Sequence, residues 1–328
     1  MKSFIFICSL SLMSQIASAY QPIVRTYYIA AEDVMWDFAP TGKNMLNGEN
    51  IPSPWGEQTI YNKVRYIEYT DASFSTKKPQ PSWLGIMGPI IRAVEGDTIK
   101  VIFKNKAAGD YSIHPHGVFY TKDNEGACYG FNATKKCAVK TGETKTYLWK
   151  ATEKSAPGIN EGGSKIWLYH SHINSVNDIY KGLLGGIIIT AKEFAGKNGL
   201  PTDVDKEFIS LIFIFNESTD EMNDEEVEGH LMHSMNGYIF GNQPGLVMKK
   251  GEKIRWHLIG MGTEVDIHTP HWHGEVVSHR GIYTDVVELL PASMLSVEML
   301  AENSGQWLYH CHVTDHISAG MISLYEIQ

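Results

Sequence analysis

The fold is decided by a stretch that occurs twice, Ile166-Trp-Leu-Tyr-His-Ser-His172 and Gln306-Trp-Leu-Tyr-His-Cys-His312. Each copy is a short aromatic and aliphatic run that ends in a His-x-His pair. Such a run predicts a β-strand, on which residues i and i+2 point to the same face. We therefore expect the two imidazoles of each pair to point in one direction.

The flanking sequence repeats in the same order. Glu95-Gly-Asp-Thr-Ile-Lys-Val101 corresponds to Lys250-Gly-Glu-Lys-Ile-Arg-Trp256, and His114-Pro-His-Gly117 corresponds to His271-Trp-His-Gly274. A repeat of about 150 residues is too long for a solenoid and fits a duplicated domain.

Between these motifs the chain consists of short runs rich in Val, Ile, Tyr and Phe, separated by Gly, Pro, Asn and Asp. No long segment has helical periodicity, and this pattern is typical of an all-β sandwich or barrel. We therefore expect two all-β domains, residues 20–192 and 207–328. The polar segment 193–206, which contains Gly and Pro, is the expected linker.

The composition indicates a soluble, exported protein. The 328 residues are 43% hydrophobic and 20% charged, which excludes a disordered chain and a multi-span membrane protein. The net charge of -9 argues against nucleic acid or anionic lipid as a partner. Residues 1–19 combine Lys2, a short apolar run and Ala17-Ser-Ala19, which predicts a cleavable signal peptide and a secreted or periplasmic protein. An uncleaved anchor would need about 20 apolar residues.

The cysteines that remain after cleavage have two expected roles. Cys128 and Cys137 lie close together in a loop rich in Gly, Asn and Lys and are expected to form a disulfide, with two free thiols as the alternative. Cys311 lies between two histidines, which indicates a metal ligand.

Four His-x-His pairs indicate a metal centre. The pairs are His114 and His116, His170 and His172, His271 and His273, and His310 and His312. Imidazole alone suits copper, zinc, iron and nickel. One cysteine, two histidines and a weak axial methionine, however, are the ligand set of a blue copper site. Around Cys311 these are His268, His316 and Met321. A zinc site would favour more clustered thiolates and no methionine.

Together these motifs resemble those of the multicopper oxidases, from about Tyr27 to the C-terminus. The resemblance implies cupredoxin-like domains, which are Greek-key β-sandwiches, and an enzyme that couples one-electron oxidations to the four-electron reduction of O2 to water. By position, the type 1 copper would be held by His268, Cys311, His316 and Met321. The eight paired histidines would hold a trinuclear cluster of one type 2 and two type 3 copper ions, so four copper ions are expected per chain.

The first domain lacks the blue-copper set, because Tyr111, Ser171 and Leu183 stand at its positions. We therefore expect one type 1 copper per chain. A copper nitrite reductase would instead keep that site in its first domain and use a three-histidine type 2 site. In longer family members six domains form a ring whose cluster joins the first domain to the last. A two-domain chain is accordingly expected to form a homotrimer with the cluster at its subunit interfaces.

The segments Met235–Gly241, Gly260–His268 and His310–His316 resemble the ceruloplasmin- and hephaestin-like ferroxidases. Those enzymes have a labile iron site beside the type 1 copper, made of carboxylates and one histidine. The matching residues here are Glu228, His233 and Asp315, together with Glu264, which would reach in from the neighbouring chain. Such oxygen ligands suit Fe²⁺ and favour Fe³⁺ more.

Several alternatives remain open for the substrate and for these acids. Two-domain laccases share the copper layout and oxidise phenols, other members of the family take Cu⁺, and a non-catalytic copper carrier is a further alternative. Glu228 ends an acidic run that is typical of a solvated loop. Asp315 is equally suited to orienting His316 through a hydrogen bond.

Overall fold

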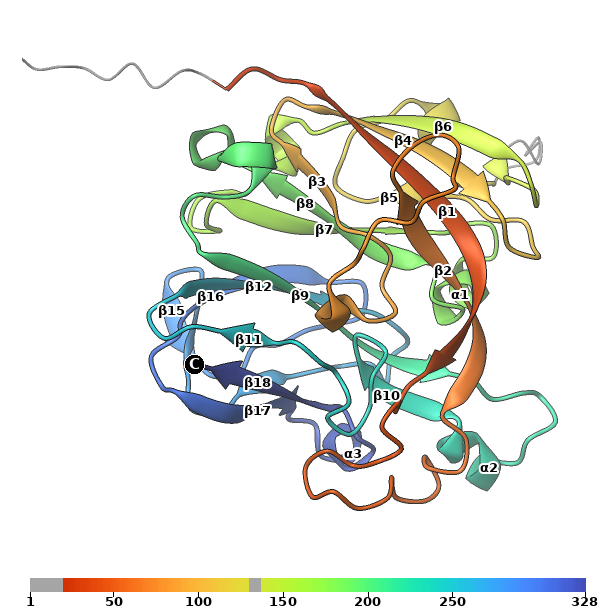
Figure 1. The fold of residues 1–328 in the computed structure, drawn as a ribbon, viewed down its shortest axis with the longest axis vertical. Coiled ribbons are helices and arrows are strands. Elements are labelled where there is room, and N and C mark those ends of the chain that lie inside the picture. The colour runs from red at the N-terminus through yellow and green to blue at the C-terminus, as the bar shows by residue number, and fades with distance from the viewer. Residues whose placement is uncertain (1–19, 130–136) are drawn as a thin grey trace, which may run out of the picture.

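The computed structural model describes residues 20–129 and 137–328, so the predicted signal peptide lies outside the described residues. In these ranges the chain is mostly β-strand, with short α-helices at α1 (Ser175–Tyr180), α2 (Asp224–Gly229) and α3 (Thr314–Ser318). None of the described helices is long and apolar enough to cross a membrane. Figure 1 shows the first half of the chain above the second half.

The first half, which we call domain 1, forms two four-stranded sheets with the orders β2-β1-β4-β6 and β3-β8-β7-β5. The strands are β1 (Val24–Asp37), β2 (Ile60–Tyr69), β3 (Ile91–Val94), β4 (Thr98–Asn105), β5 (His114–Pro115), β6 (Thr144–Lys150), β7 (Ser164–His170) and β8 (Leu184–Thr190). Every second residue of β4 is buried, so its sheet turns one apolar face inward. This pattern forms the core of a β-sandwich.

The second half, domain 2, repeats this arrangement. Its sheets have the orders β10-β9-β12-β16-β14-β15 and β11-β18-β17-β13. The strands are β9 (Lys206–Asn216), β10 (Leu231–Met235), β11 (Val247–Met248), β12 (Lys253–Gly260), β13 (Pro270–Trp272), β14 (Val277–His279), β15 (Ile282–Thr284), β16 (Met294–Leu300), β17 (Gly305–Cys311) and β18 (Ile322–Ile327). The predicted all-β, cupredoxin-like fold is confirmed.

The two domains share an apolar core. Ile166 and Leu168 of β7 pack in one cluster with Ile209 and Leu211 of β9. Eight consecutive residues of β9 are buried, because one face of this strand packs on its own sandwich and the other on domain 1. The relative placement of the domains within a chain is therefore fixed by a continuous hydrophobic interface.

A buried network of hydrogen bonds and ion pairs also crosses this interface. Arg255 on β12 is fully buried and donates to Ser164 Oγ of domain 1 at 2.9 Å, to Asp203 at 2.6 Å and to Glu298. The neighbouring Glu207 pairs with Arg92 of domain 1 at 2.6 Å. The buried charges of Arg255 and Glu207 are therefore each matched by opposite charges.

Replacing Arg255 with methionine leaves Asp203 and Glu298 without this buried cation. We expect the free energy of unfolding to fall by about 3 kcal/mol, the lower end of the range for breaking a buried pair, since both acids are partly exposed. Urea denaturation measures this loss. Lys253→Met is the matched control, because its ion pair with Glu298 is exposed and should contribute less than about 1 kcal/mol. Equal losses in the two variants would contradict the importance of the buried network.

Candidate metal centres

Four histidines of domain 1 converge where β5 and β7 meet. His114 and His170 are direct partners across these antiparallel strands. The ring centroids of His114, His116, His170 and His172 lie 5.0 to 5.5 Å apart. His116 Nε2 is 3.1 Å from His170 Nε2. The Nδ1 atoms of His114 and His170 lie 2.7 and 2.8 Å from main-chain carbonyl oxygens, which fixes these rings and leaves Nε2 as the ligand atom.

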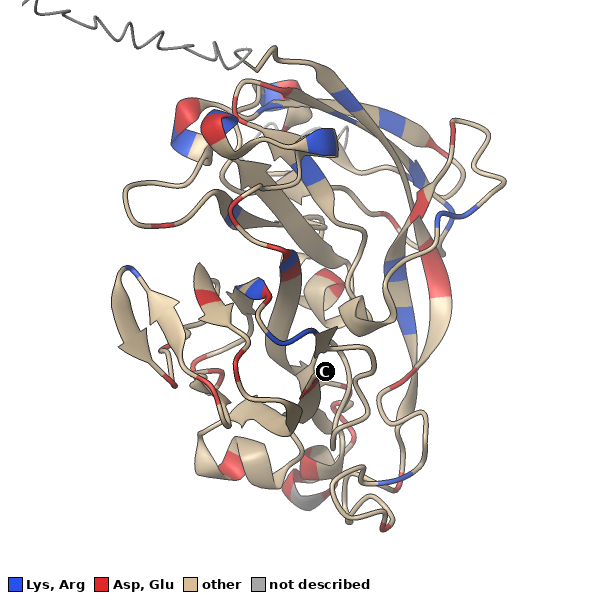
Figure 2. Cartoon of the chain, turned by 60° about the vertical axis from the view of Figure 1, so that its left-hand side comes forward, with Lys and Arg blue, Asp and Glu red and all other residues tan. Residues whose placement is uncertain are grey.

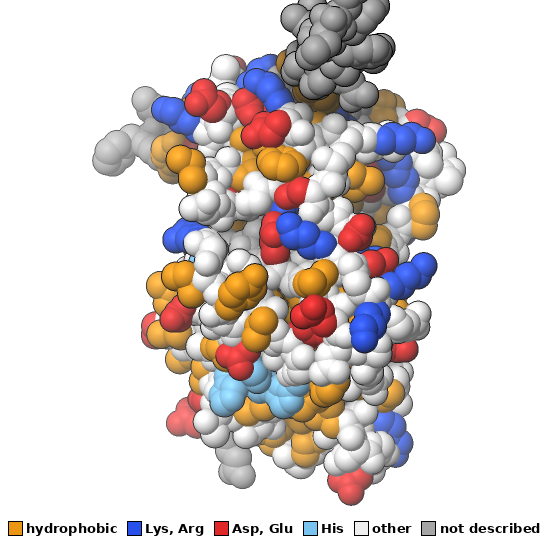
Figure 3. Space-filling view, turned by 90° about the vertical axis from the view of Figure 1, so that its left-hand side faces the viewer, with side chains coloured by type: hydrophobic (Ala, Val, Ile, Leu, Met, Phe, Trp, Pro, Cys, Tyr) orange, Lys and Arg blue, Asp and Glu red, His pale blue; other side chains and the backbone are white. Residues whose placement is uncertain are grey.

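Domain 2 contains the same arrangement on β13 and β17. His271 is the direct partner of His310, and His273 Nε2 is 3.0 Å from His310 Nε2. His312 closes the set, with its ring 5.3 Å from that of His271. His271 and His273 line an open hollow, and Figure 3 shows histidine side chains gathered at the surface of the lower half of the molecule.

Burial keeps several of these imidazoles neutral. Desolvation lowers the pKa of His116 to about 4, of His170 to about 3 and of His310 to about 4. Neutral imidazole is the form that ligates a metal ion. Both sets of histidines are therefore ready to bind metal at neutral pH.

Cys311, His268 and His316 form a third compact group, at the end of β17. The Cys311 Sγ atom lies 3.9 Å from His268 Nδ1 and 3.7 Å from His316 Nδ1, and the two Nδ1 atoms are 3.2 Å apart. These side chains are at most 3% exposed. Burial alone would raise the pKa of Cys311, but its contacts with both histidines outweigh burial and lower the pKa to about 6. A buried thiolate between two imidazoles fits the equatorial ligands of a blue copper site.

Met321 and Asp266 complete the surroundings of this group. Met321 is fully buried, and its main-chain oxygen accepts a hydrogen bond from the Cys311 amide at 3.1 Å. Asp266, which is 1% exposed, lies 3.4 Å from His268 Nε2 on the side of the ring away from Cys311. The Asp266 carboxylate therefore lies within ion-pair distance of this ring. The sequence motifs did not single out this residue, because an acid two positions before a ligand follows no general spacing.

The structure brings two of the four predicted iron ligands next to the blue-copper group. The ring of His233, buried on β10, lies 5.4 Å from that of His316. Asp315 adjoins His316 in α3 and is exposed. Glu228 on α2 and Glu264 after β12 are also exposed, and among the described residues no hydrogen bond or ion pair joins either carboxylate to His233.

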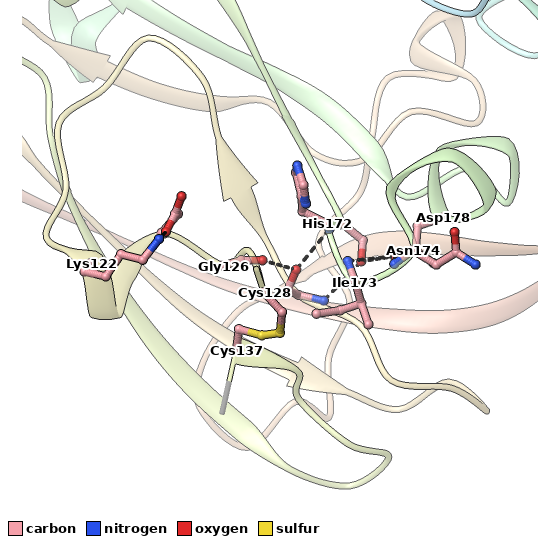
Figure 4. The surroundings of a disulfide bond; sticks show 11 residues. Lys122, Gly126, Cys128, Cys137, His172, Ile173, Asn174 and Asp178 are labelled. Atoms are coloured by element: carbon pink, nitrogen blue, oxygen red, sulfur yellow. Dashed lines mark hydrogen bonds and ion pairs between the residues drawn. A yellow bond between two sulfur atoms is a disulfide. The ribbon is translucent and has the colours of Figure 1, made fainter. Parts of the chain in front are cut away.

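The predicted disulfide between Cys128 and Cys137 is present, with its Cα atoms 5.7 Å apart. Figure 4 shows it beside the segment that carries His172. Ala127, the residue before Cys128, forms a β-bridge with His172. The disulfide thus lies next to the segment that carries His172.

Sequence profiles described as multicopper oxidase match residues 67–193 and 215–328. The chain belongs to the multicopper oxidase family. Proteins of this family are oxidoreductases that use copper, and all three groups of ligand atoms described above fit that metal.

Relatives of this multicopper oxidase include human Ferroxidase HEPHL1, at 38% identity over 93% of this chain and 29% of the relative. Human ceruloplasmin is 36% identical over 92% of this chain and 30% of its own length. The chain thus spans less than a third of these relatives. Among solved structures, a multicopper oxidase at 24% identity has a TM-score of 0.65 and covers 93% of this chain and 89% of its own. The Nitrosomonas europaea Blue Copper Oxidase has a TM-score of 0.63 at 22% identity, covering 93% and 86%.

Replacing Cys311 with serine removes the thiolate but leaves both sets of paired histidines intact. We expect the variant to lose the intense visible absorption of a copper–thiolate bond and its oxidase activity, while it keeps most of the copper bound by the paired histidines. Absorption spectroscopy and metal analysis of the purified variant measure this. Loss of all copper would show that the blue-copper group and the paired histidines do not bind independently.

Proposed function

We propose that this enzyme is a ferroxidase, which oxidises Fe²⁺ beside a type 1 copper site and reduces O2 to water at a trinuclear cluster. When bound, the copper ions supply one-electron redox chemistry. The contact between His233 and His316, with Asp315 adjoining, is the observation that carries the proposal. An imidazole beside a proposed blue-copper ligand, with a carboxylate on the adjoining residue, supports an iron site at this point.

The burial of the blue-copper group favours a small donor over a phenol. His268 and Cys311 are fully buried and His316 is 3% exposed, while His233 covers one side of His316. A bulky aromatic donor therefore cannot contact the imidazole rings of His268 or His316 from the surface. A metal ion held by His233 and Asp315 would need no such direct contact.

The charge of domain 2 also favours a cationic substrate. Residues 207–328 contain 18 acidic and 5 basic side chains, a difference of -13. Figure 2 shows acidic residues throughout the lower half of the molecule and basic residues mostly in the upper half. Such a field raises the local concentration of cations.

The chain itself connects the blue-copper group to the paired histidines. Cys311 is covalently bonded to His310 and adjoins His312 on the other side. The His310 ring also hydrogen-bonds to the Cys311 carbonyl oxygen at 2.7 Å. We propose four copper ions per chain, one at Cys311 and three shared by the paired histidines.

The cluster is proposed to form between copies of the chain. Ring contacts among the described histidines join members of the same domain, and the sets of domains 1 and 2 form separate groups. Figure 1 shows β5 in the upper half and β17 in the lower half. We propose that domain 1 of one chain meets domain 2 of the next, and that three chains close such a head-to-tail ring. The presence of a disulfide supports our proposal that the protein is exported to an oxidising compartment and is secreted or periplasmic.

Removing Glu228 and Asp315 together tests the substrate. We expect the double variant Glu228→Ala with Asp315→Ala to slow Fe²⁺ oxidation at least about tenfold, equivalent to about 1.4 kcal/mol in the barrier, because the iron loses its oxygen ligands. The slower oxidation of a dimethoxyphenol, which needs no carboxylate ligand, should be unchanged. Steady-state oxygen uptake with each substrate measures both rates.

The matched control is Glu221→Ala, which removes an exposed carboxylate from the same acidic segment as Glu228. It should leave both rates unchanged. Equal losses on iron and phenol in the double variant would mean that Asp315 only supports His316, and a laccase would then be the better assignment.

The molecular mass of the protein in solution tests the proposed trimer. Sedimentation equilibrium of the copper-loaded protein should give three chains, and dilution to the monomer should release cluster copper while the blue absorption remains. A monomer that keeps all its copper and full activity would overturn the shared cluster.

A further inference from the structure

Domain 1 contains a site equivalent to the blue-copper group of domain 2, but other residues stand at its ligand positions. Main-chain hydrogen bonds identify the equivalent positions. In domain 2, the Cys311 amide donates to Met321 O at 3.1 Å; in domain 1, the Ser171 amide donates to Leu183 O at 3.0 Å. Ser171 and Leu183 therefore stand where domain 2 has its thiolate and its axial methionine.

The same comparison identifies the residue of domain 1 that corresponds to His316. The Met321 amide donates to His316 O at 3.0 Å, and the Leu183 amide donates to Asp178 O at 3.1 Å. Asp178 thus occupies the place of the second imidazole. The sequence alone concealed this match, because Asp178 follows Ser171 by seven residues whereas His316 follows Cys311 by five.

Hydrogen bonds around Asp178 tie together the segments that carry the histidines of domain 1. Asp178 is 3% exposed, and its Oδ2 accepts from the Ser171 hydroxyl at 2.7 Å and from the amides of Ile173 and Asn174 at 3.3 and 3.1 Å. Figure 4 shows Asp178 and Asn174 beside His172. The carboxylate therefore holds the Ser171 side chain before His172 and the main chain after it.

Ser112 extends the network to β5 and to the disulfide loop. Its amide donates to Ser171 Oγ at 3.1 Å, where in domain 2 the Thr269 amide donates to Cys311 Sγ at 3.4 Å. Its hydroxyl accepts from the His172 amide at 3.1 Å and donates to Gly126 O at 2.5 Å. Three chain segments are thus joined around one buried carboxylate.

We propose that Asp178 is a positioning residue for the copper cluster. Its hydrogen bonds replace the metal–ligand bonds that would hold the corresponding segments in domain 2. They fix His172, and through Ser112 the chain leading to His114, in the arrangement that domain 1 contributes to the cluster. The domain 1 half of the cluster is therefore held in place without a copper ion at the positions of Ser171 and Asp178. The inference rests on the assignment of these histidines as cluster ligands.

The test compares cluster copper with blue copper in the same molecule. We expect Asp178→Ala to bind copper at the cluster about 10- to 100-fold more weakly, the usual effect of removing a partner that orients a ligand. A copper chelator titration, followed by the near-ultraviolet absorption of the cluster and by electron paramagnetic resonance of its type 2 copper, measures this. The blue absorption should be unchanged, because Cys311 lies in domain 2.

Three variants separate positioning from general loss of structure. Asp178→Asn keeps an acceptor oxygen and should restore most of the cluster affinity. Ser171→Ala removes one hydroxyl and should weaken copper binding at the cluster less than Asp178→Ala does. It therefore tests the proposal even if Asp178→Ala fails to fold. Asn177→Ala, an exposed change on the same helix, should have no effect. Unweakened cluster copper in both Asp178→Ala and Ser171→Ala, or in Ser171→Ala if Asp178→Ala does not fold, would overturn the proposal. A wild-type protein without cluster signals would instead overturn the ligand assignment.

Discussion

The metal centres depend on the pairing of one histidine with another across two antiparallel strands, His114 with His170 and His271 with His310. Directly opposed side chains lie close enough for a shared ligand site. A slip of one residue would turn these imidazoles to the other face of the sheet. The fully buried Tyr169 precedes His170, and Tyr309 in the same way precedes His310, so core packing fixes the register on which the sites rely.

The two domains use the same scaffold for different tasks. Domain 2 has both a half of the paired-histidine set and the compact group of His268, Cys311 and His316. Domain 1 keeps its half of the paired histidines but fills the blue-copper cage with a hydrogen-bonded serine and aspartate, Ser171 and Asp178. Under the proposed function, electrons enter in domain 2 alone. The hydrophobic interface within a chain holds the two domains together but leaves the two histidine sets apart.

The sequence predicted those parts of the site that follow a local period. The alternation of side chains on a strand was enough to expect convergence of each His-x-His pair, and the blue-copper set followed from the ligand types around Cys311. Asp178 was missed because a longer loop after β7 breaks the correspondence with His316. The network around Arg255 was missed because ion pairs between distant residues, such as Asp203 and Glu298, have no sequence period. Which sheet of domain 1 faces domain 2 is likewise a property of the tertiary packing.

A mixed assembly tests the shared cluster most directly. One chain carries His114→Ala with His170→Ala, and a second, differently tagged chain carries His271→Ala with His310→Ala. Each variant alone should consume no O2. In a mixed ring, the intact domain 2 of the first chain meets the intact domain 1 of the second. The account therefore predicts one working cluster and about a third of the wild-type rate per trimer. Mixed trimers without any O2 uptake would contradict a cluster built between chains.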